Sequence, residues 1–309
     1  MEPSGLYLHV PFCRSRCPYC DFTVVAGAGE GRIAAYFEAV ERQLVRLAAT
    51  WPWPVATVYL GGGTPSAVAA RHLCRLLEAV RRRLELLPEA EVTVEVNPGD
   101  AAGPFLREVA AAGVNRVSIG AQSFEAADLA RLGRRHAVEE IPRALEAAAA
   151  AGIERRSLDL MVGLPGQDPE AVAANVARAA ATGADHLSAY LLHLEPEVPL
   201  ARAVAAGRLT LPSEASVADQ YRTLHRAAAE AGFAAYEVSN FARPGCEARH
   251  NLGYWRCAPC LALGLGAHGM RPAAPGGWER WANEAELDRF LARVAAGGDA
   301  IASRDPVAG

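Results

Sequence analysis

Three cysteines near the start of the chain have the spacing of a metal or cluster site. Cys13, Cys17 and Cys20 follow an apolar stretch, 6–10, that is typical of a β-strand. Soft thiolates this close together suit an iron–sulfur cluster or zinc, and a loop after a strand can turn all three sulfurs towards one point. No fourth cysteine or histidine follows closely, whereas a structural zinc site normally has four ligands. The spacing therefore favours a four-iron cluster with one iron free for a substrate over buried or disulfide-forming cysteines.

Further residues that could bind a ligand come at or just after the ends of other apolar stretches. They are Gly61–Thr64, Glu95, Asn97, Gln122, Asp159 and Glu195. Glycines let the backbone approach a ligand and offer it N–H and C=O groups, although a plain turn is the structural alternative. Glu95 either lies at a solvated strand end or holds a ligand hydroxyl or ammonium group. Asp159 has apolar neighbours, and a carboxylate inside a parallel sheet requires a partner.

The elements that must position these residues alternate along the first two thirds of the chain. Strands are predicted at 6–10, 55–60, 92–96, 114–119, 158–162 and 187–192. Helices are predicted at 32–49, after residue 65 to about 87, and at 105–112, 126–132, 138–151 and 169–181. Alternation of this kind indicates parallel βαβ units, and six units make an α/β partial (β/α)6 barrel. Ligands gather at the carboxyl ends of barrel strands, where the candidate residues fall.

The pattern changes after residue 192. An irregular loop with one short helix is predicted at 193–211, a helix at 217–231 and an edge strand at 234–238. Glycine, proline and aromatic residues dominate 241–281, which predicts loop, and 284–296 has the pattern of an amphipathic helix. Nothing indicates structure at 301–309. The sequence therefore predicts a barrel at 1–235 and an irregular accessory region at 236–309.

The accessory region contains a second group of candidate residues. They are His250, Asn251, Tyr254 and Trp255. Two aromatic side chains beside an imidazole suit a large planar ligand, although a lone histidine in a loop is more often structural. Cys246, His250, Cys257 and Cys260 also form C-x3-H-x6-C-x2-C, which could bind a second metal. The two halves of that pattern are closer than in most zinc ribbons.

Composition narrows the classes of function. The net charge of −4 gives no electrostatic argument for a nucleic-acid partner. All 31 basic residues are arginine, which excludes lysine Schiff-base chemistry and a lysine-bearing phosphate loop. Seven clustered cysteines indicate a reducing compartment. Neither a signal peptide nor an apolar run of ~20 residues is visible, so a soluble, cytoplasmic protein is expected.

Several of these motifs together resemble a known family. The stretches 6–22, 61–65 and 159–165 are similar to the oxygen-independent coproporphyrinogen oxidase-like branch of the radical S-adenosylmethionine (SAM) superfamily. Within it, Cys20-Asp21-Phe22 and the motif at 250–255 are similar to HemW-type haem chaperones. This likeness makes His250, Asn251, Tyr254 and Trp255 the candidates for a haem site. The resemblance covers residues 5 to about 270. It implies a partial (β/α)6 barrel and a protein that binds haem as cargo and transfers it to acceptor proteins.

The resemblance also implies cofactors and their sites. Cys13, Cys17 and Cys20 would hold a [4Fe–4S] cluster, with SAM chelating the free iron. Gly62, Gly63 and Thr64 would face the methionyl part of SAM. The remainder, including carboxylate and ribose, would be bound by Glu95, Gln122, Arg134 and Asp159. Arg134 suits a carboxylate because its guanidinium is bidentate. Expected partners are haem-accepting proteins, a reductant such as flavodoxin or ferredoxin, and a membrane surface touched peripherally during haem delivery.

The chain differs from other members of the branch at positions that distinguish the haem chaperones from the coproporphyrinogen oxidases. The coproporphyrinogen oxidases carry another cysteine where Phe22 stands, and an N-terminal extension that this sequence does not show. Both departures favour a chaperone over radical decarboxylation of coproporphyrinogen III, and a radical SAM enzyme with an unrelated substrate is a third possibility. Relatives also continue into a further C-terminal domain beyond the point reached here. Cys257, Cys260 and Leu265 are not expected in the branch.

Overall fold

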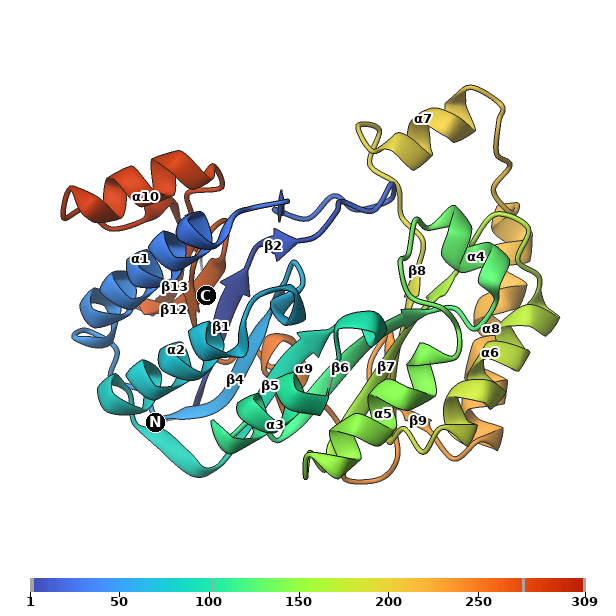
Figure 1. Cartoon of the computed structure of the whole chain (residues 1–309), viewed down its shortest axis with the longest axis horizontal. Coiled ribbons are helices and arrows are strands. Elements are labelled where there is room, and N and C mark those ends of the chain that lie inside the picture. Colours follow the sequence, from blue (N-terminus) through green and yellow to red (C-terminus); the bar gives the residue numbers. More distant parts are fainter. Residues whose placement is uncertain (1–2, 102, 274–275, 308–309) are drawn as a thin grey trace.

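In the part of the chain that the structure describes, twelve strands form one sheet with a parallel centre (Figure 1). The computed structural model describes residues 3–101, 103–273 and 276–307. The strand order across the sheet is β14-β13-β12-β11-β1-β4-β5-β6-β7-β8-β10-β9. The strands from β11 to β8 are parallel, and antiparallel strands extend the sheet at both ends. The short strands β2 and β3 pair separately.

The elements have the following bounds. The strands are β1 (Ser4–Val10), β2 (Phe12–Cys13), β3 (Val25–Ala26), β4 (Val55–Gly62), β5 (Leu86–Val96), β6 (Arg116–Gln122), β7 (Arg155–Val162), β8 (His186–Leu191), β9 (Ala234–Ala235), β10 (Asn240–Ala242), β11 (Cys260–Leu263), β12 (His268–Ala273), β13 (Gly277–Asn283) and β14 (Ile301–Val307). The helices are α1 (Glu30–Ala48), α2 (Ala70–Arg83), α3 (Gly103–Ala111), α4 (Ala126–Arg131), α5 (Glu140–Ala150), α6 (Pro169–Ala181), α7 (Pro199–Ala205), α8 (Glu214–Glu230), α9 (Arg249–Trp255) and α10 (Leu287–Ala295). Among the described residues, no helix is both long and apolar enough to cross a membrane.

The six predicted parallel strands are all present, and they are neighbours in the order in which they occur along the chain. These are β1, β4, β5, β6, β7 and β8. Their apolar residues are buried because helices cover the sheet; α1, for example, buries Ile33, Phe37, Val40 and Leu44 at helical spacing. Figure 1 shows α2, α3 and α5 in front of the sheet and α9 behind it. The prediction of an α/β partial barrel with a mostly parallel sheet is confirmed.

The prediction of an irregular C-terminal region was wrong. Residues 241–281 contain α9 and the strands β11, β12 and most of β13, and 301–307 form β14. β11 pairs in parallel with β1, so these strands continue the central sheet. The predicted helix after residue 65 also ends earlier, at Arg83, because β5 begins at Leu86. The short helix α7 and the amphipathic helix α10 were predicted correctly.

Candidate functional site

The three cysteines of the motif lie on one loop at the carboxyl end of β1. Cys13 ends β2, and Cys17 and Cys20 follow in the loop; all three are partly buried. The Cys13 sulfur lies 3.4 Å from the Thr64 hydroxyl. Burial raises the pKa of Cys13 and of Cys20, and the neighbouring thiols raise both further. The thiols are thus close enough to interact, which fits soft ligands of a shared group.

The side chains that could bind a metal ion do not converge on a single point in the part of the chain that the structure describes. Within the described residues, no three His, Cys, Asp or Glu side chains are arranged to hold a metal ion, and this includes the cysteine loop. The structure does not bring together the second predicted set either. Cys246 lies beside the Arg155 guanidinium, 2.7 Å away, Cys257 is exposed and Cys260 is buried. The hypothesis of a second metal site gains no support from this arrangement.

Arg134 joins the cysteine loop to the ends of the strands. Its guanidinium lies 3.8 Å from the Cys17 sulfur and 3.4 Å from the Tyr19 hydroxyl. It also donates to the Gly120 carbonyl at 2.8 Å and to the Asn97 side chain. Burial lowers the pKa of Arg134, but Tyr19 and Cys17 outweigh burial and raise it. A fixed positive charge beside a thiol stabilises the thiolate form, which is the form that binds metal.

The glycines after β4 let the strand end pack against the cysteine loop. Gly62 has a φ of +107°, and a Cβ on Gly63 would lie 2.6 Å from the carbonyl carbon of Pro11. The N–H groups of Gly63 and Thr64 donate to the carbonyls of Val10 and Phe12. The Gly62 N–H donates to Glu95 at 2.9 Å. The N–H groups of Gly62, Gly63 and Thr64 are therefore bonded within the protein, and the ligand role of these residues stays a prediction.

Two buried carboxylates, Glu95 of β5 and Asp159 of β7, lie on strands that flank β6. Glu95 accepts hydrogen bonds from the Tyr59 hydroxyl at 2.7 Å and from Gly62, and Asp159 accepts one from the Ser118 hydroxyl at 2.8 Å. Burial raises the pKa of Glu95 to about 7, and the Asp159 charge adds to the shift. Burial also raises the pKa of Asp159, against the Ser118 hydrogen bond. The serine partner meets the requirement inferred for a carboxylate in a parallel strand.

Strand register explains why these side chains share a face. Successive residues of a strand point to opposite sides, and paired residues of neighbouring strands point to the same side. Tyr7 pairs with Tyr59, Glu95 with Ser118, and Asp159 with Ser188. Tyr7, Tyr59, Ser118 and Ser188 were not singled out from the sequence. They could have been found in the sequence, because they are polar residues that alternate with apolar ones along the predicted strands.

Gln122 shows backbone strain at the carboxyl end of β6. Its φ is +67°, a left-handed value uncommon outside glycine, and the pairing of β6 with β7 shifts register there. Strain of this kind clusters at ligand sites and is retained where the surroundings enforce it. Glu95, Gln122, Arg134 and Asp159 are thus placed together at the carboxyl end of the sheet, and their ligand roles stay predictions.

The motif at 250–255 forms a helix and not a loop. His250 is only 3% exposed; its Nδ1 lies 2.8 Å from the Thr57 hydroxyl and its Nε2 lies 2.9 Å from the Tyr254 hydroxyl. Its ring stacks on Tyr59 at 5.2 Å, and burial lowers its pKa to about 3. The Trp255 indole N–H donates to Glu237. With both nitrogens hydrogen-bonded, His250 anchors α9 against β4 in this structure.

A cavity of about 730 Å³ connects the cysteine loop to the sheet extension. Its lining includes Gly62 and Glu95 of the parallel strands, Asp21 and Phe22 of the cysteine loop, and residues of β12 and β13. Tyr254 of the predicted haem group also lines it, whereas His250, Asn251 and Trp255 do not. The cavity thus adjoins the residues predicted to bind SAM.

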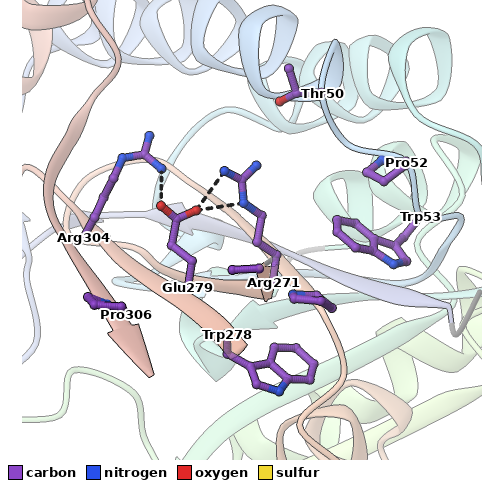
Figure 2. A pocket seen from close by; sticks show the side chains of 10 residues that line it. Thr50, Pro52, Trp53, Arg271, Trp278, Glu279, Arg304 and Pro306 are labelled. Atoms are coloured by element: carbon purple, nitrogen blue, oxygen red, sulfur yellow. Dashed lines mark hydrogen bonds and ion pairs between the residues drawn. The ribbon is translucent and has the colours of Figure 1, made fainter. Parts of the chain in front are cut away.

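A smaller cavity of about 470 Å³ shares no lining residue with the larger one. Figure 2 shows it between Trp53 and Trp278, with the Glu279 carboxylate bound by both Arg271 and Arg304. Arg304 also pairs with Asp299 at 3.1 Å. The two arginines are therefore neutralised by two carboxylates, and the group fastens β12, β13 and β14 together.

The sequence and the fold of this chain are similar to those of known proteins. Residues 7–178 match the model of the radical SAM superfamily. The chain is 42% identical over 271 residues to heme chaperone HemW of Mycobacterium tuberculosis, covering 87% of this chain and 70% of that one. It is 38% identical over 270 residues to heme chaperone HemW of Escherichia coli K12, with the same coverage. The solved structure of coproporphyrinogen III oxidase (HemN) from Escherichia coli matches 99% of this chain and 72% of that chain, with a TM-score of 0.83 and 25% identity.

Proposed function

Because the chain belongs to the radical SAM superfamily and, within it, to the HemW-type family, we propose that it is an iron–sulfur protein that binds haem and transfers it to acceptor proteins. The observation that carries the proposal is 42% identity over 87% of the chain to a heme chaperone, compared with 25% to the oxidase. Phe22, which stands where the oxidases have another cysteine, agrees with it.

The superfamily implies a [4Fe–4S] cluster and SAM, and we assign residues to each. Cys13, Cys17 and Cys20 would hold the cluster, and Arg134 would stabilise their thiolates across the 3.8 Å contact with Cys17. When bound, a reduced cluster of this type supplies the electron that cleaves SAM. Gly62, Gly63 and Thr64 would shape the methionyl site with their carbonyls and close backbone packing, since their N–H groups are occupied.

The remaining polar residues would bind the rest of SAM. Gln122 ends β6 and pairs with Leu160, the residue after Asp159 in β7, so Gln122 could donate to a ribose and Asp159 could accept from it. Glu95, with a pKa of about 7, exists in both protonation states at neutral pH and would hold or release a proton beside the cavity. Haem-accepting proteins, a flavodoxin- or ferredoxin-like reductant and a membrane surface are the proposed partners. A cytoplasmic location and no nucleic-acid partner complete the proposal.

Radical decarboxylation of coproporphyrinogen III is the second candidate, and the TM-score of 0.83 to the oxidase is the observation in its favour. A pair of assays on the anaerobically reconstituted chain separates the two. Added haem should give a stable Soret band beside the iron–sulfur absorption, and this haem should pass to an apo-globin. With SAM, dithionite and coproporphyrinogen III, no protoporphyrinogen IX should accumulate; its formation over many turnovers would replace the chaperone with the oxidase.

A further inference from the structure

The cavity of about 730 Å³ has the size of a small-molecule site, for which about 300–1,000 Å³ is usual. One wall is the end of the cysteine loop, where the Phe22 ring is 62% exposed. Another part of the lining comes from β12 and β13. A large exposed aromatic ring bordering a cavity is a common feature of a binding site, because a flat apolar ligand can cover it.

Register places four side chains of the cavity lining on one face of the sheet. Met270 pairs with Cys260 of β11 and with Arg280 of β13. His268 comes two residues before Met270 and therefore points to the same side. These four side chains all line the cavity. The wall thus presents an imidazole, a thioether, a thiol and a guanidinium to whatever lies against it.

Most of the groups in the cavity that could ligate iron are already engaged. The His9 ring lies 3.0 Å from the Tyr7 hydroxyl through Nδ1 and 2.8 Å from the Thr23 carbonyl through Nε2. The Tyr254 hydroxyl meets His250 at 2.9 Å. Cys260 is buried, and burial raises its pKa to about 12, which keeps it a thiol.

The His268 ring differs from these groups. It is exposed, and within the described part of the chain it makes no hydrogen bond or ion pair through its side chain. Arg280 likewise has no carboxylate partner among the described residues, although its neighbours Arg271 and Arg304 are both paired. A free imidazole and a free guanidinium are thus held on one face of the sheet, in a cavity that Phe22 also lines.

We propose that haem occupies this cavity, with its iron bound by His268, its ring against Phe22 and a propionate paired with Arg280. Imidazole is a common axial ligand of haem, and a guanidinium binds a carboxylate through two parallel hydrogen bonds. This inference rests on the proposed haem-binding function and says where on the protein the haem binds. It moves the iron ligand from His250, whose nitrogens are occupied, to a residue 18 positions later in the sequence, on β12.

Titration of the reconstituted chain with haem tests the ligand. His268→Ala should raise the Kd for haem at least about tenfold and shift the Soret band, and added imidazole should restore the wild-type spectrum. His193→Ala is the matched control, since His193 is an exposed histidine outside the cavity. An unchanged Kd and Soret band in His268→Ala, or a thiolate-ligated spectrum in the wild type pointing to Cys257, would overturn the assignment.

The propionate contact has its own test. Arg280→Gln should weaken binding of haem about tenfold and leave binding of haem dimethyl ester unchanged, because the ester has no carboxylate to pair. An equal loss for both compounds would refute the pairing. These results are distinguishable from failure of the proposed function. If the wild type binds no haem, the chaperone proposal falls; if it binds haem and both variants bind equally well, only the location is wrong.

Discussion

The Nδ1 atom of His250 lies 2.8 Å from the hydroxyl oxygen of Thr57, although the two residues are 193 positions apart in the sequence. The contact fastens α9 to β4 on the inner face of the sheet. Burial holds the imidazole neutral, with its pKa lowered to about 3, so it can donate through one nitrogen and accept through the other.

His250→Ala should therefore lower stability more than it changes SAM binding. The substitution leaves a cavity against Tyr59 and removes partners from Thr57 and Tyr254, at a cost of about 2–4 kcal/mol. Urea unfolding of the reconstituted chain measures the loss, with His193→Ala as the exposed control. Wild-type stability combined with lost haem binding would instead make His250 the iron ligand.

Glu95→Gln should change the pH dependence of stability. The folded pKa of Glu95 is raised from its ordinary 4.5 to about 7. Well below pH 4.5, Glu95 is protonated in both the folded and the unfolded state, so it does not lower the stability of the folded protein. As pH rises towards 7 the unfolded state ionises first, so the wild type loses stability. Glu95→Gln cannot ionise and has no such loss. The free energy of unfolding of the variant minus that of the wild type should therefore increase by about 2 kcal/mol between pH 5.5 and pH 8. Parallel pH curves would refute the shift.

Cys17→Ala should abolish cluster assembly. The wild-type chain is expected to bind about four irons after anaerobic reconstitution, and two remaining thiolates cannot hold the cluster. Cys74→Ala is the matched control, because Cys74 lies on α2, outside the cysteine loop, and its thiol donates to the Glu108 carbonyl. Iron and sulfide analysis decides the matter: full iron content in Cys17→Ala contradicts the assignment.

Asp159→Ala should weaken SAM binding while leaving the cluster intact. Loss of one hydrogen-bonded carboxylate typically costs ~1.5–3 kcal/mol, or about ten- to a hundredfold in Kd. Calorimetry with SAM measures the change, and Asp219→Ala, which removes an exposed carboxylate of α8, serves as control. If both variants bind SAM as the wild type does, Asp159 has a structural role only, through Ser118.

The parallel part of the fold was predictable because its signals are local. Each of the six strands has buried apolar residues within one short stretch, and each is followed by a helix with residues such as Ile33 and Phe37 at helical spacing. The position of Glu95 near the end of β5 follows from the same alternation, whereas Asp159 lies in the middle of β7. Their partners could not be predicted, since Tyr59 and Ser118 reach them only through the register between strands.

The helix α9 could not be predicted because its stabilising contact is remote. Residues 249–255 include Gly253, Asn251 and His250, which are poor helix formers, and no side chain of the preceding residue caps the helix. The first N–H groups of α9, from Arg249 and His250, donate instead to the Glu91 carboxylate at 3.1 and 3.0 Å. That carboxylate belongs to β5, 158 positions before Arg249.

The pairing of β1 with β11 has a consequence for synthesis of the chain. Gly5 pairs with Cys260, so one edge of β1 stays open until some 255 further residues have left the ribosome. At about 5–20 residues per second, this interval is on the order of 10–50 s. An open strand edge is a template for pairing with other chains. A nascent chain arrested before residue 260 therefore carries a first strand that is paired with β4 on one side and open on the other.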